Sequence, residues 1–173
     1  GTSAKLHKLM LTVDAVTCTT ERLADAIFAV NENVGVLPNA IDANYSGLRV
    51  GRFESEKYTF GYLGGPCHVR DLGLLKGLQK EMTEKLKDYV IRLFGFNGTD
   101  IYKHYAGILS DERKSENFSL YKGADIFHYP QFYNLMDCSL VPLEHNYFNS
   151  MKSELKLIEA GHFKKACIVS NVE

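Results

Sequence analysis

Residues 58–71 read YTFGYLGGPCHVRD, an apolar run that ends in two adjacent glycines and then becomes polar. The run Tyr58–Leu63 predicts a short buried strand. Glycine has no Cβ, so Gly64 and Gly65 would let the backbone approach a bulky ligand closely. A helix is expected over residues 70–86, and its free N–H groups would face an anion held at this loop.

Apolar runs and helical periodicity alternate along the rest of the chain. Further strands are expected over residues 15–18, 34–37, 89–94, 118–121, 138–143 and 166–170, and helices over 20–30, 99–107, 130–136 and 150–160. Residues 42–55 show no period and are interpreted as a boundary or linker. This alternation predicts a Rossmann-like three-layer α/β/α fold with a mostly parallel sheet. Ligands of such sheets bind at the carboxyl ends of strands, which points to the loops near Gly64, Leu143 and Ser170.

Composition narrows the function classes. The net charge is −1, with 45% hydrophobic and 24% charged residues, which is a globular composition and argues against a general nucleic-acid binder. The cysteines at positions 18, 67, 138 and 167 form no CxxC pair and are expected to be buried thiols in a reducing compartment. No apolar run reaches 18 residues, so no membrane span is expected.

The glycine loop supports two interpretations. Arg70 would stand at a helix start, where the dipole disfavours a cation unless an anion is bound, and its guanidinium could hold phosphate in bidentate fashion. His68 could contact the same ligand. The alternative is a tight strand-to-helix turn with Arg70 paired to Asp71 or solvated. The loop is neither a GxGxxG fingerprint nor a GxxxxGK[ST] phosphate loop, so NAD binding and ATP hydrolysis lose support.

A second candidate segment covers residues 142–161. A helix over residues 150–160 would place Lys152, Lys156 and Glu159 within about 60° of arc. Two lysines spaced i, i+4 repel by about 0.2–0.5 kcal/mol, and a bound diphosphate would remove that conflict. A solvated face with a Lys156–Glu159 ion pair is equally compatible with the spacing. Glu144, directly after a strand, is another candidate, and His128 and His145 are weaker ones.

Taken in order, four segments resemble the donor-binding domain of B-type glycosyltransferases of the retaining group 1, or family 4, kind. The resemblance covers nearly the whole chain. DAVTCTT (residues 14–20) and VGVLPNAID (residues 34–42) are similar to the crossover between the two domains of that family. Residues 61–71 are similar to its first donor-domain loop, and DCSLVPL (residues 137–143) with the segment that follows is similar to its signature loop and helix.

The resemblance implies roles for individual residues. Arg70 and Lys152 would stabilise the diphosphate as catalytic cations. Glu159 would bind the donor ribose, whereas Met151 stands where many relatives have a second glutamate. The remaining residues expected to bind substrate are Gly64, Gly65, His68, Glu144, Phe148, Asn149, Ser153 and Lys156. The family normally needs no metal ion, and no cofactor is expected.

The resemblance also implies the setting of the reaction. Residues 1–42 would be the end of an amino-terminal domain with the crossover, and residues 43–173 a nucleotide-sugar-binding domain incomplete at its carboxyl end, so this fragment alone is expected to be inactive. A nucleotide-diphosphate sugar would donate to a sugar, lipid-linked or protein acceptor bound by the missing half. Surface polysaccharide or lipopolysaccharide synthesis is the expected context, either in the cytoplasm or at the inner face of the cell membrane.

Two other classes remain as alternatives. A non-catalytic nucleotide- or nucleotide-sugar-binding module with a degenerate glycosyltransferase fold would account for Met151. A phosphate-accepting signalling domain also has a doubly wound sheet, but it needs an acidic pair after its first strand. Asp14 and Asp137 do not supply that pattern, so this class is the weakest of the three.

Overall fold

The computed structural model describes residues 2–51, 54–110 and 116–172. The chain divides into two compact units. The smaller unit contains residues 1–40, 145–155 and 172–173, and the larger unit contains residues 41–144 and 156–171. Residues 52 and 53 of the expected linker lie outside the described residues.

The smaller unit begins with α1 (Thr2–Thr12), which the sequence pattern did not predict. Strands β1 (Val16–Cys18) and β2 (Val34–Val36) pair in parallel on either side of α2 (Glu21–Phe28) in the chain order. The expected cap of α2 is confirmed, because the Oγ1 atom of Thr20 accepts the N–H of Leu23 at 3.2 Å. The segment of residues 145–155 also belongs to this unit, and the Thr20 hydroxyl donates to the carbonyl of Met151 at 2.8 Å.

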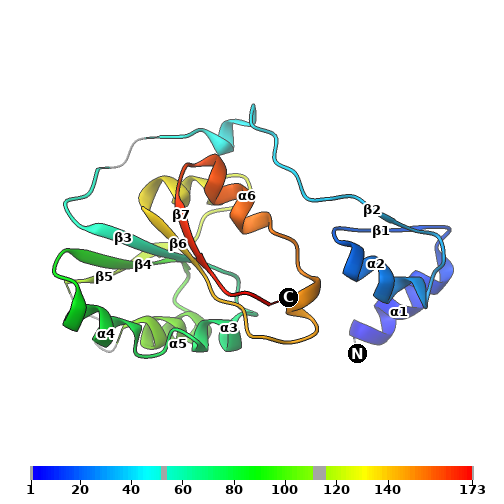
Figure 1. Cartoon of the computed structure of the whole chain (residues 1–173), viewed down its shortest axis with the longest axis horizontal. Helices are drawn as coiled ribbons and strands as arrows, with labels where there is room; N and C mark the ends of the chain where they lie inside the picture. Colours follow the sequence, from blue (N-terminus) through cyan, green and yellow to red (C-terminus); the bar gives the residue numbers. More distant parts are fainter. Residues whose placement is uncertain (1, 52–53, 111–115, 173) are drawn as a thin grey trace. The chain divides into compact units, whose positions relative to one another are not determined.

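The larger unit contains a five-stranded sheet in the order β5-β4-β3-β6-β7, with every neighbouring pair parallel (Figure 1). Its strands are β3 (Tyr58–Leu63), β4 (Tyr89–Phe96), β5 (Phe118–Lys122), β6 (Cys138–Val141) and β7 (Ala166–Val169). The expected parallel sheet is therefore confirmed, and the order is that of a Rossmann-like sheet.

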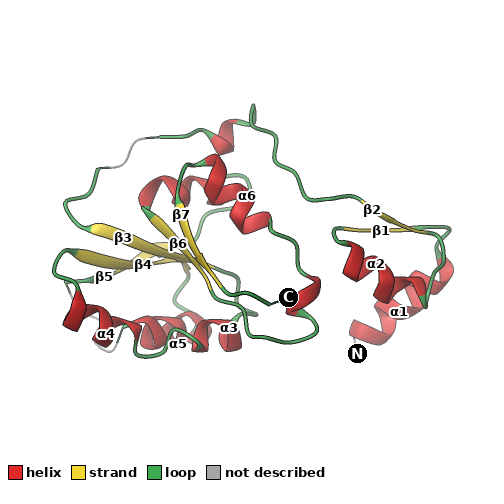
Figure 2. Ribbon diagram, in the orientation of Figure 1, coloured by secondary structure: helices red, strands yellow, loops and turns green. Residues whose placement is uncertain are grey.

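Helices cover both faces of this sheet (Figure 2). One face carries α3 (Val69–Gly73), α4 (Leu78–Lys85) and α5 (Asp100–Leu109). The other carries the 3₁₀-helix η2 (Tyr129–Leu135) and α6 (Leu155–His162), and a short 3₁₀ turn, η1 (Ser46–Leu48), packs against the same core. The three-layer α/β/α fold expected from the sequence is present.

Alternation along the strands builds a core on each face. In β4, Ile91 and Leu93 are fully buried in the core shared with α4 and α5. The next residue, Phe94, joins the opposite core with Tyr133 of η2 and Phe163. Such period-two alternation is what a sheet buried on both faces requires.

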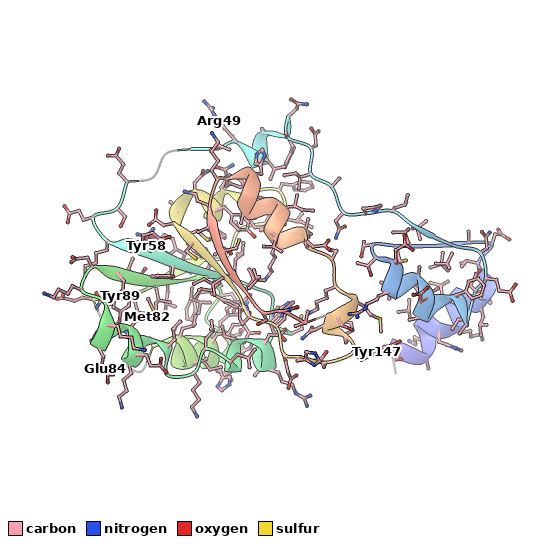
Figure 3. All side chains as sticks on the ribbon, viewed as in Figure 1. Arg49, Tyr58, Met82, Glu84, Tyr89 and Tyr147 are labelled. Carbon is pink, nitrogen blue, oxygen red and sulfur yellow. The ribbon has the colours of Figure 1, made fainter. Side chains whose placement is uncertain are left out.

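The side chain of Tyr89, at the start of β4, packs against α4 and forms hydrogen bonds with it (Figure 3). Its ring lies in the same core as Met82. Its hydroxyl lies 2.6 Å from Oγ1 of Thr83 and donates to the carbonyl of Gln79 at 3.1 Å. The buried phenol therefore has its polar atom satisfied.

Strand order also fixes where a ligand can be held. The chain adds β4 and then β5 on one side of β3 within the sheet, and it then returns to add β6 and β7 on the other side of β3. The loops after β3 and β6 therefore leave the sheet in opposite directions. In open α/β sheets this switch point opens a crevice at the carboxyl ends of the two strands.

Three expectations about local structure were wrong. The single helix over residues 70–86 is divided into α3 and α4, with Gly77 between them in the left-handed region at φ +82°. Instead of the single helix expected over residues 150–160, the chain forms a 3₁₀ turn, η3 (Asn149–Met151), and then α6, which starts only at Leu155. Gly161 lies inside α6. Cys67 is exposed, whereas Cys18 and Cys138 are buried.

Candidate functional site

Two tyrosines of α5 hold the glycine loop that follows β3. The Tyr102 hydroxyl donates to the carbonyl of Gly64 at 3.1 Å, and the Tyr105 hydroxyl donates to the carbonyl of Gly65 at 2.9 Å. The Tyr105 oxygen also accepts the backbone N–H of His68 at 2.9 Å. Burial raises the pKa of both phenols, so they keep their protons at neutral pH and remain donors.

The two glycines of the loop have different surroundings. A Cβ on Gly64 would lie 2.5 Å from the hydroxyl oxygen of Tyr62 and 2.8 Å from its Cζ. Tyr62 is 1% exposed and packs edge-on against Tyr105, with ring centroids 6.0 Å apart. A Cβ on Gly65 would meet no atom within 4 Å. Gly64 is therefore required by packing, whereas Gly65 borders open space.

One buried carboxylate links the loops after β3 and β6. Asp71 lies in α3 and is 6% exposed. Its Oδ2 atom lies 2.7 Å from Nδ1 of His68, and its Oδ1 atom accepts the backbone N–H of Glu144 at 2.8 Å. The structure thus brings His68 and the backbone of Glu144 together at the switch point.

Lys156 reaches the same edge of the sheet from the first turn of α6. Its Nζ atom donates to the carbonyl of Leu63, the last residue of β3, at 2.6 Å, and lies 5.6 Å from the ring centroid of Tyr62. Since this lysine is half-buried, its charge is held in place at the strand end. A fixed cation beside a glycine loop can bind the oxygens of a phosphate group.

Glu159 lies one turn further along α6 and is 5% exposed. One carboxylate oxygen accepts the hydroxyl of Tyr129 in a short hydrogen bond, and the other accepts the hydroxyl of Tyr133 at 2.9 Å. Burial, with Glu159 as a further cause, raises the pKa of both phenols. Both tyrosines belong to η2, so this carboxylate is held by the segment that precedes β6.

Four of the expected site residues belong to the smaller unit. They are Phe148, Asn149, Lys152 and Ser153. The Nζ atom of Lys152 lies 5.1 Å from the ring centroid of Phe148, which is 71% exposed, and Ser153 accepts a short hydrogen bond from the side chain of Asn39. Asn149 is buried, and its N–H donates to the side chain of Asn146 at 2.8 Å. Lys152 follows η3 and lies before the first residue of α6, so it does not share one helix with Lys156, and the argument from their i, i+4 spacing does not apply.

Arg70 is exposed on α3, the short helix that follows the glycine loop. His128 pairs with Asp125 at the surface, with Nδ1 2.8 Å from a carboxylate oxygen, and His145 is exposed. Arg70 is thus free of the buried network that holds His68.

Sequence reasoning missed the residues that organise the site. Asp71 was considered only as a partner for Arg70, and Tyr62, Tyr102 and Tyr105 were not considered at all. Tyr102 and Tyr105 contact the loop across 38 and 40 residues of chain. A helical spacing of aromatic residues in 99–107 was the available signal, but it is as typical of a packing face.

Within the described residues, no cluster of three or more histidine, cysteine, aspartate or glutamate side chains could hold a metal ion. No helix among the described residues has the length and apolar character needed to cross a membrane.

A solved structure supports the fold. The crystal structure of a glycosyltransferase from Rickettsia africae ESF-5 is similar to this chain, with a TM-score of 0.64 and 11% sequence identity over 97% of the chain. The chain spans 48% of the length of that neighbour. No family model matches the sequence, and no curated protein matches it either. The likeness shows a Rossmann-like fold of the glycosyltransferase kind.

Proposed function

We propose that this chain is the donor-binding part of a glycosyltransferase, which moves a sugar from a nucleotide-diphosphate sugar to an acceptor. The observation that carries the proposal is the gathering of the glycine loop, His68, the backbone of Glu144 and Lys156 at the switch point of the sheet. This is the position where sheets of this order bind nucleotides. The likeness to a glycosyltransferase of about twice the length gives independent support for the fold on which the site is built.

Departure of the nucleoside diphosphate develops negative charge, and fixed cations at that position lower the barrier. Lys156 is held at the strand end, and Arg70 lies exposed beside the loop. In this proposal Arg70 acts on the leaving diphosphate, and Lys156 and the glycine loop position it. Glu159 of the same unit belongs to the donor site.

The rest of the reaction setting follows from the same proposal. Residues 1–42 would carry the crossover from an amino-terminal domain that binds the acceptor, and closure of the two domains would bring the reactants together. The acceptor would be a sugar, a lipid-linked sugar or a protein. The enzyme would act in the cytoplasm at the inner face of the membrane, in surface polysaccharide or lipopolysaccharide synthesis.

Calorimetry tests the binding step. We expect the chain to bind at least one of UDP, GDP and dTDP, and Lys156→Ala and Arg70→Ala to weaken that binding about tenfold each, since a charge-assisted hydrogen bond contributes about 1.5–3 kcal/mol. Lys80→Ala is the matched control, because Lys80 is an exposed lysine of α4. Circular dichroism would establish that each variant is folded. If a folded chain binds none of the three, or if the control weakens binding as much as the site variants, the proposal is contradicted.

Two observations favour a second candidate function, that of a non-catalytic nucleotide-sugar-binding module. Both carboxylate oxygens of Glu159 already accept tyrosine hydroxyls, and Met151 stands where the family resemblance leads one to expect another glutamate. Release of nucleoside diphosphate from a bound sugar nucleotide by the whole protein separates the two candidates. Binding with turnover supports the enzyme, and tight binding without turnover supports the module.

A further inference from the structure

Asp71 occupies a position from which one side chain can control the ligand site. Its carboxylate is 6% exposed and uses a different oxygen for each loop: Oδ2 for His68 after β3, and Oδ1 for the N–H of Glu144 after β6. These are the two loops that diverge at the switch point. A substitution at Asp71 would therefore change both the orientation of the His68 ring and the contact that joins the two loops.

The contact also determines which nitrogen of His68 carries a proton. A carboxylate only accepts hydrogen bonds, so Nδ1 at 2.7 Å must be the protonated nitrogen. When the ring is neutral, Nε2 is then an acceptor, and when the ring is charged, Nε2 becomes a donor. The backbone of the same residue is fixed by its N–H to the Tyr105 oxygen at 2.9 Å, and the side chain stays 21% exposed. The ring is thus oriented from two sides and still reachable by a ligand.

We propose that Asp71 is a positioning residue that holds His68 ready to donate, in its charged form, through Nε2 to a phosphate oxygen of the bound ligand. This inference rests on the proposed function, which supplies the diphosphate. It adds a pH-sensitive anion contact to the fixed charge of Lys156, and it assigns to Asp71 a role in ligand binding as well as in joining the loops.

The other charged and titratable groups of this site come from the loop of His68 and from four further segments. They are Cys67 in the loop, Arg70 on α3, Tyr102 and Tyr105 on α5, Glu144 after β6, and Lys156 on α6. Burial raises the pKa of the two tyrosines, so they stay neutral between pH 5 and 9. Histidine is the side chain that ordinarily changes charge between pH 5 and 8. A change of affinity in that interval is therefore expected to follow His68.

Replacing Asp71 by asparagine makes the test specific. The amide oxygen can still accept the N–H of Glu144, while the amide nitrogen would donate to Nδ1 of His68. The neutral ring would then carry its proton on Nε2 and could donate to phosphate at any pH. Loss of a merely structural contact would weaken binding but would not remove its pH dependence.

The binding experiment uses UDP-glucose and GDP-mannose, whose diesterified phosphates do not titrate between pH 5.5 and 8.5. In the unaltered chain we expect affinity for the sugar nucleotide that binds to fall at least fivefold as the pH rises across this interval. In the Asp71→Asn variant, the affinity is expected to change less than twofold across the same pH interval. His68→Gln should bind more weakly with the same flat profile, and it serves in place of Asp71→Asn if that variant does not fold.

Imidazole ¹⁵N NMR spectra of the free chain provide a readout that needs no ligand. The proton of neutral His68 should be found on Nδ1 in the unaltered chain and on Nε2 in Asp71→Asn. The opposite tautomer in the unaltered chain, or an equal pH dependence of binding in all three proteins, would overturn the inference and leave the proposed function standing. Absence of binding by the unaltered chain at every pH would overturn the phosphate contact and the proposed function together.

Discussion

Gly64 and Gly65 are neighbours in the chain, yet only one of them has a buried ring against its α-carbon. A Cβ on Gly64 would overlap the phenol of Tyr62, which is fully buried and cannot swing away, whereas a Cβ on Gly65 would meet nothing within 4 Å. We expect Gly64→Ala to lower the free energy of unfolding by about 1–3 kcal/mol, the usual cost of overpacking. Gly65→Ala is the matched control and should change it by less than about 0.5 kcal/mol.

Urea denaturation monitored by tyrosine fluorescence measures both variants. Equal effects of the two substitutions would contradict the assignment of Gly64 to packing. A ligand-binding defect in Gly65→Ala with unchanged stability would agree with open space that a ligand fills.

At the scale of single residues, the sequence named several residues of the candidate site, whose role in binding stays a prediction. The glycine pair, His68, Glu144 and Lys156 were named from strand-end position and helical spacing, and the structure places them at the carboxyl edge of the sheet. Asp71 was missed as a link, because its partner Glu144 lies 73 residues away and nothing in a local pattern reveals such a contact. The exposure of Cys67 was also mispredicted, since the apolar setting of its neighbours does not extend into the glycine loop.

Among the secondary-structure elements, the bounds of the strand β3 were predicted more accurately from the sequence than the bounds of the helices. The bounds of β3 are those expected, because a short apolar run between polar residues and glycines is bounded on both sides. The helix over residues 70–86 was wrong because its apolar periodicity continues through a break at Gly77. The start of α6 was predicted about one turn too early, because residues 149–151 form a separate 3₁₀ turn that the helical periodicity did not distinguish from the helix.

The break between α3 and α4 makes a testable contrast between two glycines. Gly77 has φ +82°, a conformation that costs an L-residue about 1–2 kcal/mol, so Gly77→Ala should lower the free energy of unfolding by that amount. Gly73 ends α3 with ordinary backbone geometry and no atom within 4 Å of an added Cβ. Gly73→Ala should leave stability unchanged or raise it by up to about 1 kcal/mol.

Thermal and urea unfolding of the two variants check this contrast. A stabilised Gly77→Ala chain would mean that residues 70–86 form one continuous helix, as the periodicity alone indicates. The same outcome would remove the distinction between α3 and α4 on which the placement of the short helix beside the glycine loop depends.

For the whole molecule, alternation of strands and helices was enough to predict a parallel sheet covered on both faces. It was not enough to give the strand order, because pairing depends on which strands meet after long connections. The order β5-β4-β3-β6-β7 is what turns the glycine loop and the loop after β6 into the two sides of one switch point. At 11% identity, the likeness to a solved glycosyltransferase is a likeness of fold.

Backbone NMR of the ¹⁵N-labelled chain titrated with UDP, GDP and dTDP tests the central claim most directly, because it locates the bound ligand on the sheet. We predict that one of the three shifts the amide signals of residues 64–65, 67–70 and 143–146, which follow the carboxyl ends of β3 and β6, and leaves those of residues 57–59 and 88–90 at the amino ends unchanged. Shifts confined to the amino ends, or no shift with any of the three, would contradict a diphosphate site at the switch point.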